Sequence, residues 1–158
     1  MYGLLSEFSA MQGLRVLVSG GEPTLYRHFQ QLNDVLPEFP LRFVLLSNGS
    51  LFNDKFAASL NFHEVQISLD GMKAGHEMIR GSGAYESALK AMQSIRNAGL
   101  DLSVATMIHS GNLNEWDEMS RLMESLGVRE WSIDYPCVKG RFADHPELAV
   151  PLIEAAKR

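Results

Sequence analysis

Residues 14–23 read Leu-Arg-Val-Leu-Val-Ser-Gly-Gly-Glu-Pro. The first six of them are apolar almost throughout, which predicts a β-strand over Leu14–Ser19. Gly20 and Gly21 end this strand, because glycine permits tight turns and lets a backbone approach a ligand closely. Taken alone, the stretch is equally a strand that ends in an ordinary turn. The stretch becomes informative because the same pattern, an apolar strand followed by glycine or small polar residues, recurs in the rest of the chain.

The chain on either side of this stretch alternates short strands with helices. Further strands are predicted over Arg42–Ser47, Glu64–Leu69, Asp101–Ile108 and Glu130–Asp134. Helices are predicted over residues 25–36, 54–60 and 84–98, from an N-cap at Asn114 to Gly127, and near 147–157 after an irregular segment at 135–146. Gly99 stands where a C-terminal glycine is expected. Apolar residues recur at helical spacing as Leu4, Leu5, Phe8 and Met11, as Tyr85, Leu89, Met92 and Ile95, and as Trp116, Met119, Met123 and Leu126.

This alternation predicts an α/β fold with a parallel sheet, because parallel neighbours need crossover connections. Five strands in 158 residues are too few for a closed barrel of eight strands, which needs about 250 residues, so an open or partial barrel in one domain is expected. An ordinary doubly wound nucleotide-binding domain is disfavoured, since no Gly-x-Gly-x-x-Gly follows the first strand.

Composition and charge exclude some classes of function. The formal net charge is −5 and the basic residues are scattered, so nucleic-acid binding is not expected. No apolar stretch approaches the roughly 20 residues of a membrane span, and no signal peptide opens the chain, which favours a cytoplasmic protein. The one cysteine, Cys137, cannot form a disulfide within the chain or a multi-cysteine metal site. Taken alone, a single cysteine is most often an inert, small apolar residue.

Small polar residues and glycines gather where the predicted strands end, which is where ligands bind in parallel sheets. These ends are Ser19 to Pro23, Ser47-Asn48-Gly49, Ser68-Leu69-Asp70-Gly71, Met107-Ile108-His109 and Tyr135-Pro136. Such residue types suit a small molecule that carries an amine, a carboxylate and a ribose. Each piece alone has a plainer interpretation. Asn-Gly is a common turn, His76 and Arg80 could share an exposed helix face, and His109 could be a satisfied loop histidine.

The order and spacing of the set resemble the radical S-adenosylmethionine family. Gly20-Gly21-Glu22-Pro23 matches that family's Gly-Gly-Glu-Pro motif, and Ser47-Asn48-Gly49 is similar to its Thr-Asn-Gly. The stretch from Ser68 to Tyr85 resembles the peptide- and protein-modifying branch, which includes sulfatase maturases and SPASM-like enzymes. Asn112, Leu126-Gly127-Val128 and Pro136 through Gly140 extend the resemblance, which covers about residues 10–145.

The resemblance implies a fold and a set of roles. The fold would be a partial (β/α)6 barrel in which this chain supplies the second to sixth strands. Gly20, Gly21 and Glu22, followed by Pro23, would hold the methionine amino group of S-adenosylmethionine through their carbonyls. Ser68 and Arg80 would bind its carboxylate or ribose, with Asn48 and Asp70 on the same rim. The backbone near Met107 and His109, together with Tyr135, would flank the adenine.

The family also needs a 4Fe–4S cluster held by three cysteines, whereas this chain holds one cysteine, in another place. Cys137 is therefore either an incidental residue, a ligand to an auxiliary cluster or a residue at the radical site. The absence of the three cluster cysteines has three explanations. The sequence starts late in its reading frame, it is the ordered part of a longer protein, or it is a short protein that binds S-adenosylmethionine without radical chemistry. We expect truncation, because the match begins within a helix. The first strand would then be an unpaired edge, which predicts dimerisation or poor solubility.

Two functions remain open. The first is a radical S-adenosylmethionine enzyme, an iron–sulfur oxidoreductase whose 5′-deoxyadenosyl radical takes a hydrogen atom from a peptide, protein or tetrapyrrole-type substrate. No catalytic side chain and no metal ligand is assigned within this chain. The second is a non-catalytic remnant or accessory domain that binds a nucleotide-like ligand or a partner protein.

Overall fold

A computed structural model describes residues 2–136 and 143–156 of the chain. Cys137 and the run to Gly140 lie outside these residues. The described part contains five strands: β1 (Arg15–Val18), β2 (Arg42–Ser47), β3 (Glu64–Ser68), β4 (Asp101–Met107) and β5 (Glu130–Asp134). They form one sheet in the order β1-β2-β3-β4-β5, and all four pairings are parallel. The predicted α/β class and parallel sheet are confirmed.

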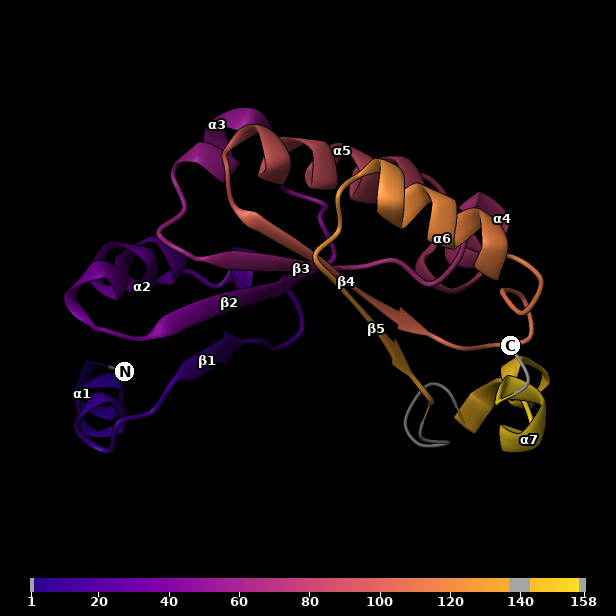
Figure 1. Cartoon of the computed structure of the whole chain (residues 1–158), viewed down its shortest axis with the longest axis horizontal. Helices are drawn as coiled ribbons and strands as arrows, with labels where there is room; N and C mark the ends of the chain where they lie inside the picture. Colours follow the sequence, from indigo (N-terminus) through magenta and orange to yellow (C-terminus); the bar gives the residue numbers. More distant parts are fainter. Residues whose placement is uncertain (1, 137–142, 157–158) are drawn as a thin grey trace.

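The helices between the strands lie on one face of the sheet, whereas the first and the last described helices lie below its two ends (Figure 1). The helices are α1 (Tyr2–Ala10), α2 (Phe29–Val35), α3 (Asp54–Ala58), α4 (Lys73–Arg80), α5 (Ala84–Asn97), α6 (Trp116–Ser125) and α7 (Leu152–Ala155), with 3-10 turns η1 (Pro23–Leu25), η2 (Leu36–Glu38) and η4 (Pro146–Leu148). Gly99 and Gly127 adopt the positive φ angles, 75° and 61°, that favour glycine just after helices α5 and α6.

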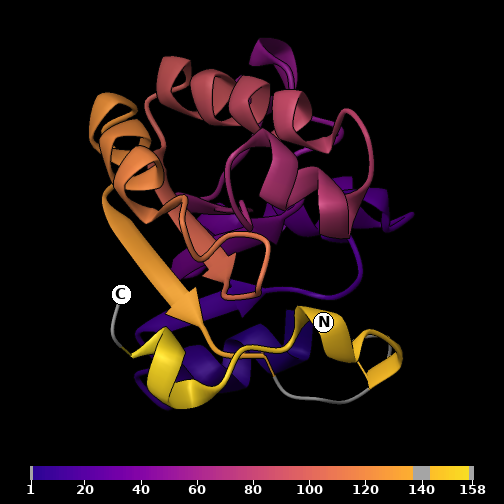
Figure 2. The ribbon, with the colours of Figure 1, turned by 90° about the vertical axis from the view of Figure 1, so that its right-hand side faces the viewer.

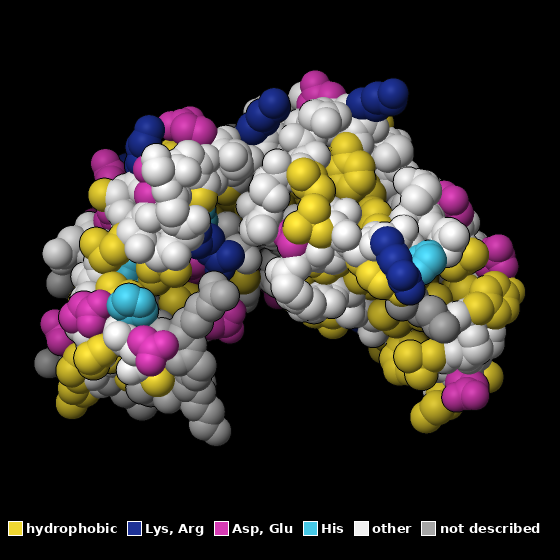
Figure 3. Space-filling view, turned by 180° about the vertical axis from the view of Figure 1, so that it is seen from behind, with side chains coloured by type: hydrophobic (Ala, Val, Ile, Leu, Met, Phe, Trp, Pro, Cys, Tyr) yellow, Lys and Arg dark blue, Asp and Glu magenta, His cyan; other side chains and the backbone are white. Residues whose placement is uncertain are grey.

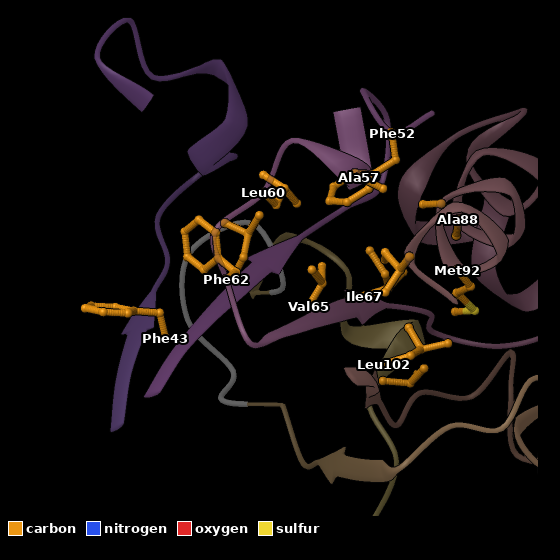
Figure 4. Packing of buried hydrophobic residues seen from close by; sticks show 14 of the residues in the cluster. Phe43, Phe52, Ala57, Leu60, Phe62, Val65, Ile67, Ala88, Met92 and Leu102 are labelled. Carbon is orange, nitrogen blue, oxygen red and sulfur yellow. The ribbon is translucent and has the colours of Figure 1, made fainter. Parts of the chain in front are cut away.

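The core lies between the sheet and its covering helices (Figure 4). Val65 and Ile67 of β3 and Met92 of α5 are fully buried there, as the alternation along β3 and the helical stripe along α5 predict. Each fully buried side chain of this size contributes roughly 1.5–3 kcal/mol. The core therefore holds the strands in register and fixes where each of them ends.

The sheet curls toward a barrel. Its two edge strands, β1 and β5, approach each other across the uncovered face, where Arg15 Nη1 lies 4.0 Å from Glu130 Oε2. In the space-filling view the molecule is an arch that is open at its lower side (Figure 3). This curvature gives the uncovered face the shape of a barrel interior.

The uncovered face carries polar side chains along β3, β4 and β5, together with apolar residues such as Leu17 and Val44. The strand register places Glu64 beside Asp101, Gln66 beside Ser103, and Ser103 beside Glu130, so these side chains share one face. At the amino ends of the strands, the Glu64 carboxylate accepts hydrogen bonds from Arg15 (3.1 Å), Arg42 (3.0 Å) and Ser103 (2.7 Å). This charged cluster closes one end of the interior and leaves the carboxyl end for a ligand.

Four local predictions are wrong. The helix predicted over 25–36 is broken into η1, α2 and η2, and the break lets Phe29 enter the core and stack on Phe62. The final predicted helix is reduced to η4 and α7 within its described part. Helix α6 begins at Trp116 with Glu115, not Asn114, at its N-cap. In the predicted stripe along α1, Leu4 and Met11 are 68% and 79% exposed and do not belong to the core.

Candidate functional site

The loops after the strands lie together at the carboxyl edge of the sheet. In Figure 2 the arrowheads of β4 and β5 point toward the viewer, and α4 lies in front of the sheet on this side. All eleven residues predicted to hold the ligand lie in these loops, at the strand ends or, for Arg80, at the last position of α4. Parallel strands bring such residues to one edge, although they are far apart in the sequence.

The Gly20–Gly21 turn exposes its backbone. Gly20 has a φ angle of +152°, which residues other than glycine rarely adopt. A Cβ atom added at either glycine would meet nothing within 4 Å, so the space beside the turn is open. Within the described residues, no N–H or O–H group donates to the carbonyl oxygen of either glycine. These two carbonyls are therefore free to accept hydrogen bonds from a ligand.

The Glu22 side chain ties the end of β1 to the end of β2. Its Oε1 accepts from the hydroxyls of Ser47 (2.9 Å) and Thr24 (2.6 Å), and its Oε2 accepts from the Asn48 N–H (2.8 Å). Oε1 also accepts from the Thr24 N–H at 3.2 Å, which caps η1. Because both carboxylate oxygens are bonded within the protein, the backbone of this segment is the part with unused acceptors for a ligand.

Asp70 holds together the loops after β3 and β4. The residue is 1% exposed, and its Oδ1 accepts from the Met107 N–H at 2.8 Å, while its Oδ2 accepts from Arg80 Nε. Its backbone carbonyl accepts from Asn112 Nδ2 and His109 Nε2, both at 2.8 Å. Every polar group of Asp70, including its N–H, is bonded within the protein.

Arg80 and Ser68 keep unused donors at this edge. The Arg80 side chain is 34% exposed, and only its Nε is bonded within the part of the chain that the structure describes. Its Nη1 and Nη2 carry four further N–H groups. The Ser68 hydroxyl, at the end of β3, has no bonded partner among the same residues. These two side chains fit a carboxylate or a ribose hydroxyl.

The His109 side chain is bonded on both ring nitrogens within the protein, as a satisfied loop histidine would be. It is fully buried, its Nε2 lies 2.8 Å from the Asp70 carbonyl, and its Nδ1 accepts from the Gly111 N–H at 3.1 Å. Since Nδ1 accepts, the ring proton sits on Nε2 and points at that carbonyl. Asn112 completes the arrangement, as its Oδ1 accepts from the His109 N–H at 3.0 Å. Only the backbone near His109 remains for a ligand.

His76 fixes the same loop from α4. Its Nδ1 accepts the Asp70 N–H at 2.9 Å, whereas its buried Nε2 makes no hydrogen bond of normal geometry with any described residue. Burial lowers the pKa of His76 below its usual value, against the opposing attraction of the Asp70 charge. The neutral ring acts as a hydrogen-bond acceptor for the loop. The sequence left open an exposed helix face shared by His76 and Arg80, and this interpretation is wrong for His76, which is 1% exposed. Its place six residues after Asp70 was the available signal for its role.

The remaining predicted residues have mixed exposure. Asn48 Oδ1 accepts from the Ser50 N–H at 2.9 Å, which leaves its Nδ2 unbonded among the described residues. Pro23 is buried within η1. Met107, paired with Asp134 in the register, faces the barrel interior. The Tyr135 hydroxyl donates to the Val150 carbonyl, so this side chain lies against the segment before α7. The site thus consists of two hydrogen-bonded clusters, one around the Glu22 carboxylate and one around Asp70. Within residues 2–136 no hydrogen bond joins the partners of Glu22 to the partners of Asp70.

The fold and the site define a partial parallel barrel with unused carbonyls, an arginine and hydroxyl groups at the carboxyl edge of its strands. The model of the radical SAM superfamily matches residues 4–123, and the chain belongs to this superfamily. The family uses S-adenosylmethionine and a 4Fe–4S cluster. Its members are enzymes, so the chain resembles an enzyme.

Curated relatives and solved structures agree with this assignment. The chain is 30% identical over 130 residues to the mycofactocin maturase MftC of Mycolicibacterium smegmatis, covering 79% of this chain and 33% of the relative. It is 28% identical over 145 residues to the AdoMet-dependent heme synthase of Nitratidesulfovibrio vulgaris, covering 89% and 40%. Streptococcus suis SuiB bound to S-adenosylmethionine has the same fold, with a TM-score of 0.75, 16% identity, and coverage of 87% of this chain and 33% of that one. The chain spans between a third and two fifths of these relatives.

The residues of this chain fit one of the two family cofactors. Free carbonyls and a free guanidinium edge match the ammonium and the carboxylate of S-adenosylmethionine. The cluster does not fit, because three thiolates are required and the sequence has one cysteine. Among the described residues, no group of three His, Cys, Asp or Glu side chains is arranged to hold a metal ion.

Proposed function

We propose that this chain is the S-adenosylmethionine-binding core of a radical S-adenosylmethionine enzyme that modifies a peptide, protein or tetrapyrrole-type substrate. The observation that carries the proposal is the pairing of unused groups at one edge of the sheet. The carbonyls of Gly20 and Gly21 can accept from an ammonium, and the Arg80 guanidinium can donate to a carboxylate. An amino acid zwitterion, as in the methionine part of S-adenosylmethionine, needs both.

The chain's own residues bind and orient the cofactor. Glu22 positions the glycine carbonyls, Asp70 and His76 order the loop after β3, and the Ser68 hydroxyl faces the ligand beside Arg80. The backbone from Met107 to His109 would flank the adenine, with Tyr135 nearby. The bound cofactor, together with the cluster, supplies the radical that removes a hydrogen atom from the substrate. We propose that the cluster cysteines lie outside these 158 residues.

The substrate class is supported by the relatives alone. MftC is named a maturase, and one SuiB structure contains the precursor peptide SuiA. The second relative is named a heme synthase, which keeps a tetrapyrrole-type substrate in the proposal. Within the described residues no helix is long and apolar enough to cross a membrane. We propose a cytoplasmic protein that does not bind nucleic acid, and association of two copies through β1.

The test compares this chain with a version extended by the codons upstream of Met1. Both are reconstituted anaerobically, and iron, sulfide and the products of S-adenosylmethionine cleavage are measured. The proposal predicts that the extended protein takes up about four irons and cleaves the cofactor. If neither protein takes up iron, or if iron is bound without cleavage, the radical mechanism is contradicted for this protein.

The single cysteine favours a second candidate function, a non-catalytic domain that binds a nucleotide-like ligand or a partner protein. Translation that starts at Met1, shown by mass spectrometry of the protein from its natural host, would support this candidate. A natural protein with an in-frame Cys-x3-Cys-x2-Cys segment before Met1 would exclude it.

A further inference from the structure

We propose that Asp70 is a positioning residue: it does not touch the ligand, but aims the Arg80 guanidinium so that the site selects ligands with an α-carboxylate. The inference rests on the proposed function and deepens it. Sequence reasoning placed Asp70 on the ligand rim beside Ser68 and Arg80. The structure gives it a different place, because all of its polar groups are already bonded within the protein.

Asp70 fixes the orientation of the Arg80 side chain. Arg80 is the last residue of α4, and its long side chain would otherwise lose up to about 2 kcal/mol of rotamer freedom when a ligand orders it. The hydrogen bond from Nε to Asp70 Oδ2 fixes the plane of the guanidinium before any ligand arrives. Because the guanidinium is rigid and planar, fixing Nε also fixes the direction of the Nη1 and Nη2 donors.

Asp70 is itself held rigidly by its neighbours. A positioning residue works only if it cannot move with its partner. Asp70 is held from four directions, by the Met107 N–H at its carboxylate, by His76 at its N–H, and by Asn112 and His109 at its carbonyl. The residue is 1% exposed, so water does not compete for these bonds. Preorganisation of this kind raises affinity by lowering the entropy lost on binding.

The ion pair between Asp70 and Arg80 also affects which anions can bind. The Asp70 carboxylate neutralises part of the Arg80 charge, so the pair is not a general anion trap. What remains is a directional edge of N–H donors, which favours a planar carboxylate that accepts two parallel hydrogen bonds. The site should therefore discriminate strongly between ligands with and without the amino acid part, while the adenosine part is bound by other residues.

The experiment measures two ligands on the same set of variants by isothermal titration calorimetry. S-adenosylmethionine carries the α-carboxylate, and 5′-methylthioadenosine carries the same nucleoside and sulfur without the amino acid. The inference predicts that Asp70→Asn weakens binding of S-adenosylmethionine by about tenfold to hundredfold and leaves 5′-methylthioadenosine within about twofold of the original protein. A general loosening of the loop would weaken both ligands equally, and that result would overturn the inference.

A double-mutant cycle with Arg80→Met tests whether Asp70 acts through Arg80. If it does, Asp70→Asn adds no further loss of affinity once Arg80 has been replaced. Additive losses would show that Asp70 contacts the ligand or acts by another route. Arg80→Lys should also lose affinity for S-adenosylmethionine, because a single ammonium bound to Asp70 leaves no planar donor edge. Full affinity in Arg80→Lys would contradict the inference, even if Asp70→Asn were to unfold.

These outcomes separate the inference from the proposed function. If the original protein binds S-adenosylmethionine and the variants keep the same preference between the two ligands, only the positioning role is lost. If the original protein binds neither ligand, the proposed function itself fails and the inference falls with it. Lys73→Ala is the matched control, because Lys73 lies on the same helix and, among the residues that the structure describes, pairs only with the exposed Glu86.

Discussion

The Glu22 carboxylate lies 2.9 Å from the Ser47 hydroxyl and joins the loop after β1 to the end of β2. The same carboxylate accepts the Asn48 N–H, so both loops depend on one side chain. Glu22 thereby organises the turn whose carbonyls are left free for the ligand. Glu22, a residue of the family motif, thus links two loops by hydrogen bonds, and its replacement should affect both stability and ligand binding.

Glu22→Ala should lower the free energy of unfolding by about 1–3 kcal/mol, because it leaves the Ser47 hydroxyl and the Asn48 N–H without their acceptor. Urea denaturation measures the change. Glu86→Ala is the control, since Glu86 forms only an exposed pair with Lys73 and should cost about 0.5 kcal/mol or less. Equal losses in the two variants would contradict the structural role of Glu22.

The charged cluster at the amino ends of the strands should matter for stability and not for binding. Glu64→Ala should cost about 3 kcal/mol, because it leaves Arg15 and Arg42 without their buried partner, although both arginines are partly exposed. Glu130→Ala should cost less than about 1 kcal/mol, because Glu130 is exposed and lies 4.0 Å from Arg15. Urea denaturation of both variants, together with ligand titration, would check this. A loss of affinity in folded Glu64→Ala would contradict it.

The stability of the protein should depend on His76 in weakly acidic solution. Burial lowers the pKa of His76 in the folded state, so the unfolded chain binds more protons there. The contribution is present above the unfolded value of about 6.5 and is lost as the pH falls below it. The thermal midpoint should fall between pH 7.5 and 5.5, and less steeply in His76→Asn, whose side-chain oxygen can still accept the Asp70 N–H.

A second histidine provides the control for this pH dependence. His28→Asn replaces a histidine that lies outside the loop after β3, and it serves as the control substitution. If His76→Asn and the original protein show the same slope, His76 does not carry the effect.

The protein should associate through β1. Among the described strands β1 pairs only with β2, and Leu14 and Leu17 are 84% and 53% exposed. Size-exclusion chromatography with light scattering should give twice the monomer mass, and Leu17→Lys should shift it to the monomer, because a charge on an edge strand opposes pairing. A monodisperse monomer of the original protein would contradict this expectation.

The sequence predicts the strands well and the fourth helix not at all. The predicted and observed bounds of β2 are identical, because an apolar run ends at Asn48–Gly49. Helix α4 reads KAGHEMIR, with a glycine in its second half-turn and few apolar residues. A Cβ atom at Gly75 would lie 2.4 Å from the end of the Glu115 side chain and 3.2 Å from the Gly111 carbonyl, so this helix packs closely against the loop after β4. Local patterns carry no record of such a contact.

The sequence predicts that the candidate site residues gather at one edge of the sheet, but it does not predict which partners their side chains bond. Motif spacing put Glu22, Asp70 and His109 at the carboxyl edge, since parallel strands end there. Whether a polar side chain faces a ligand or the protein depends on partners distant in sequence. Asp70 meets Met107 and Asn112, which are 37 and 42 residues away. His109 bonds to the same residue, which is 39 positions away in the sequence.

The most direct test of the central claim is the binding of S-adenosylmethionine to this chain, measured by isothermal titration calorimetry before any cluster is reconstituted. The account predicts one site per chain, competition by S-adenosylhomocysteine, and a loss of about tenfold or more in Arg80→Met but not in Glu86→Ala. No binding to the folded protein, or equal affinity in Arg80→Met, would contradict the assignment of the carboxyl edge as the cofactor site.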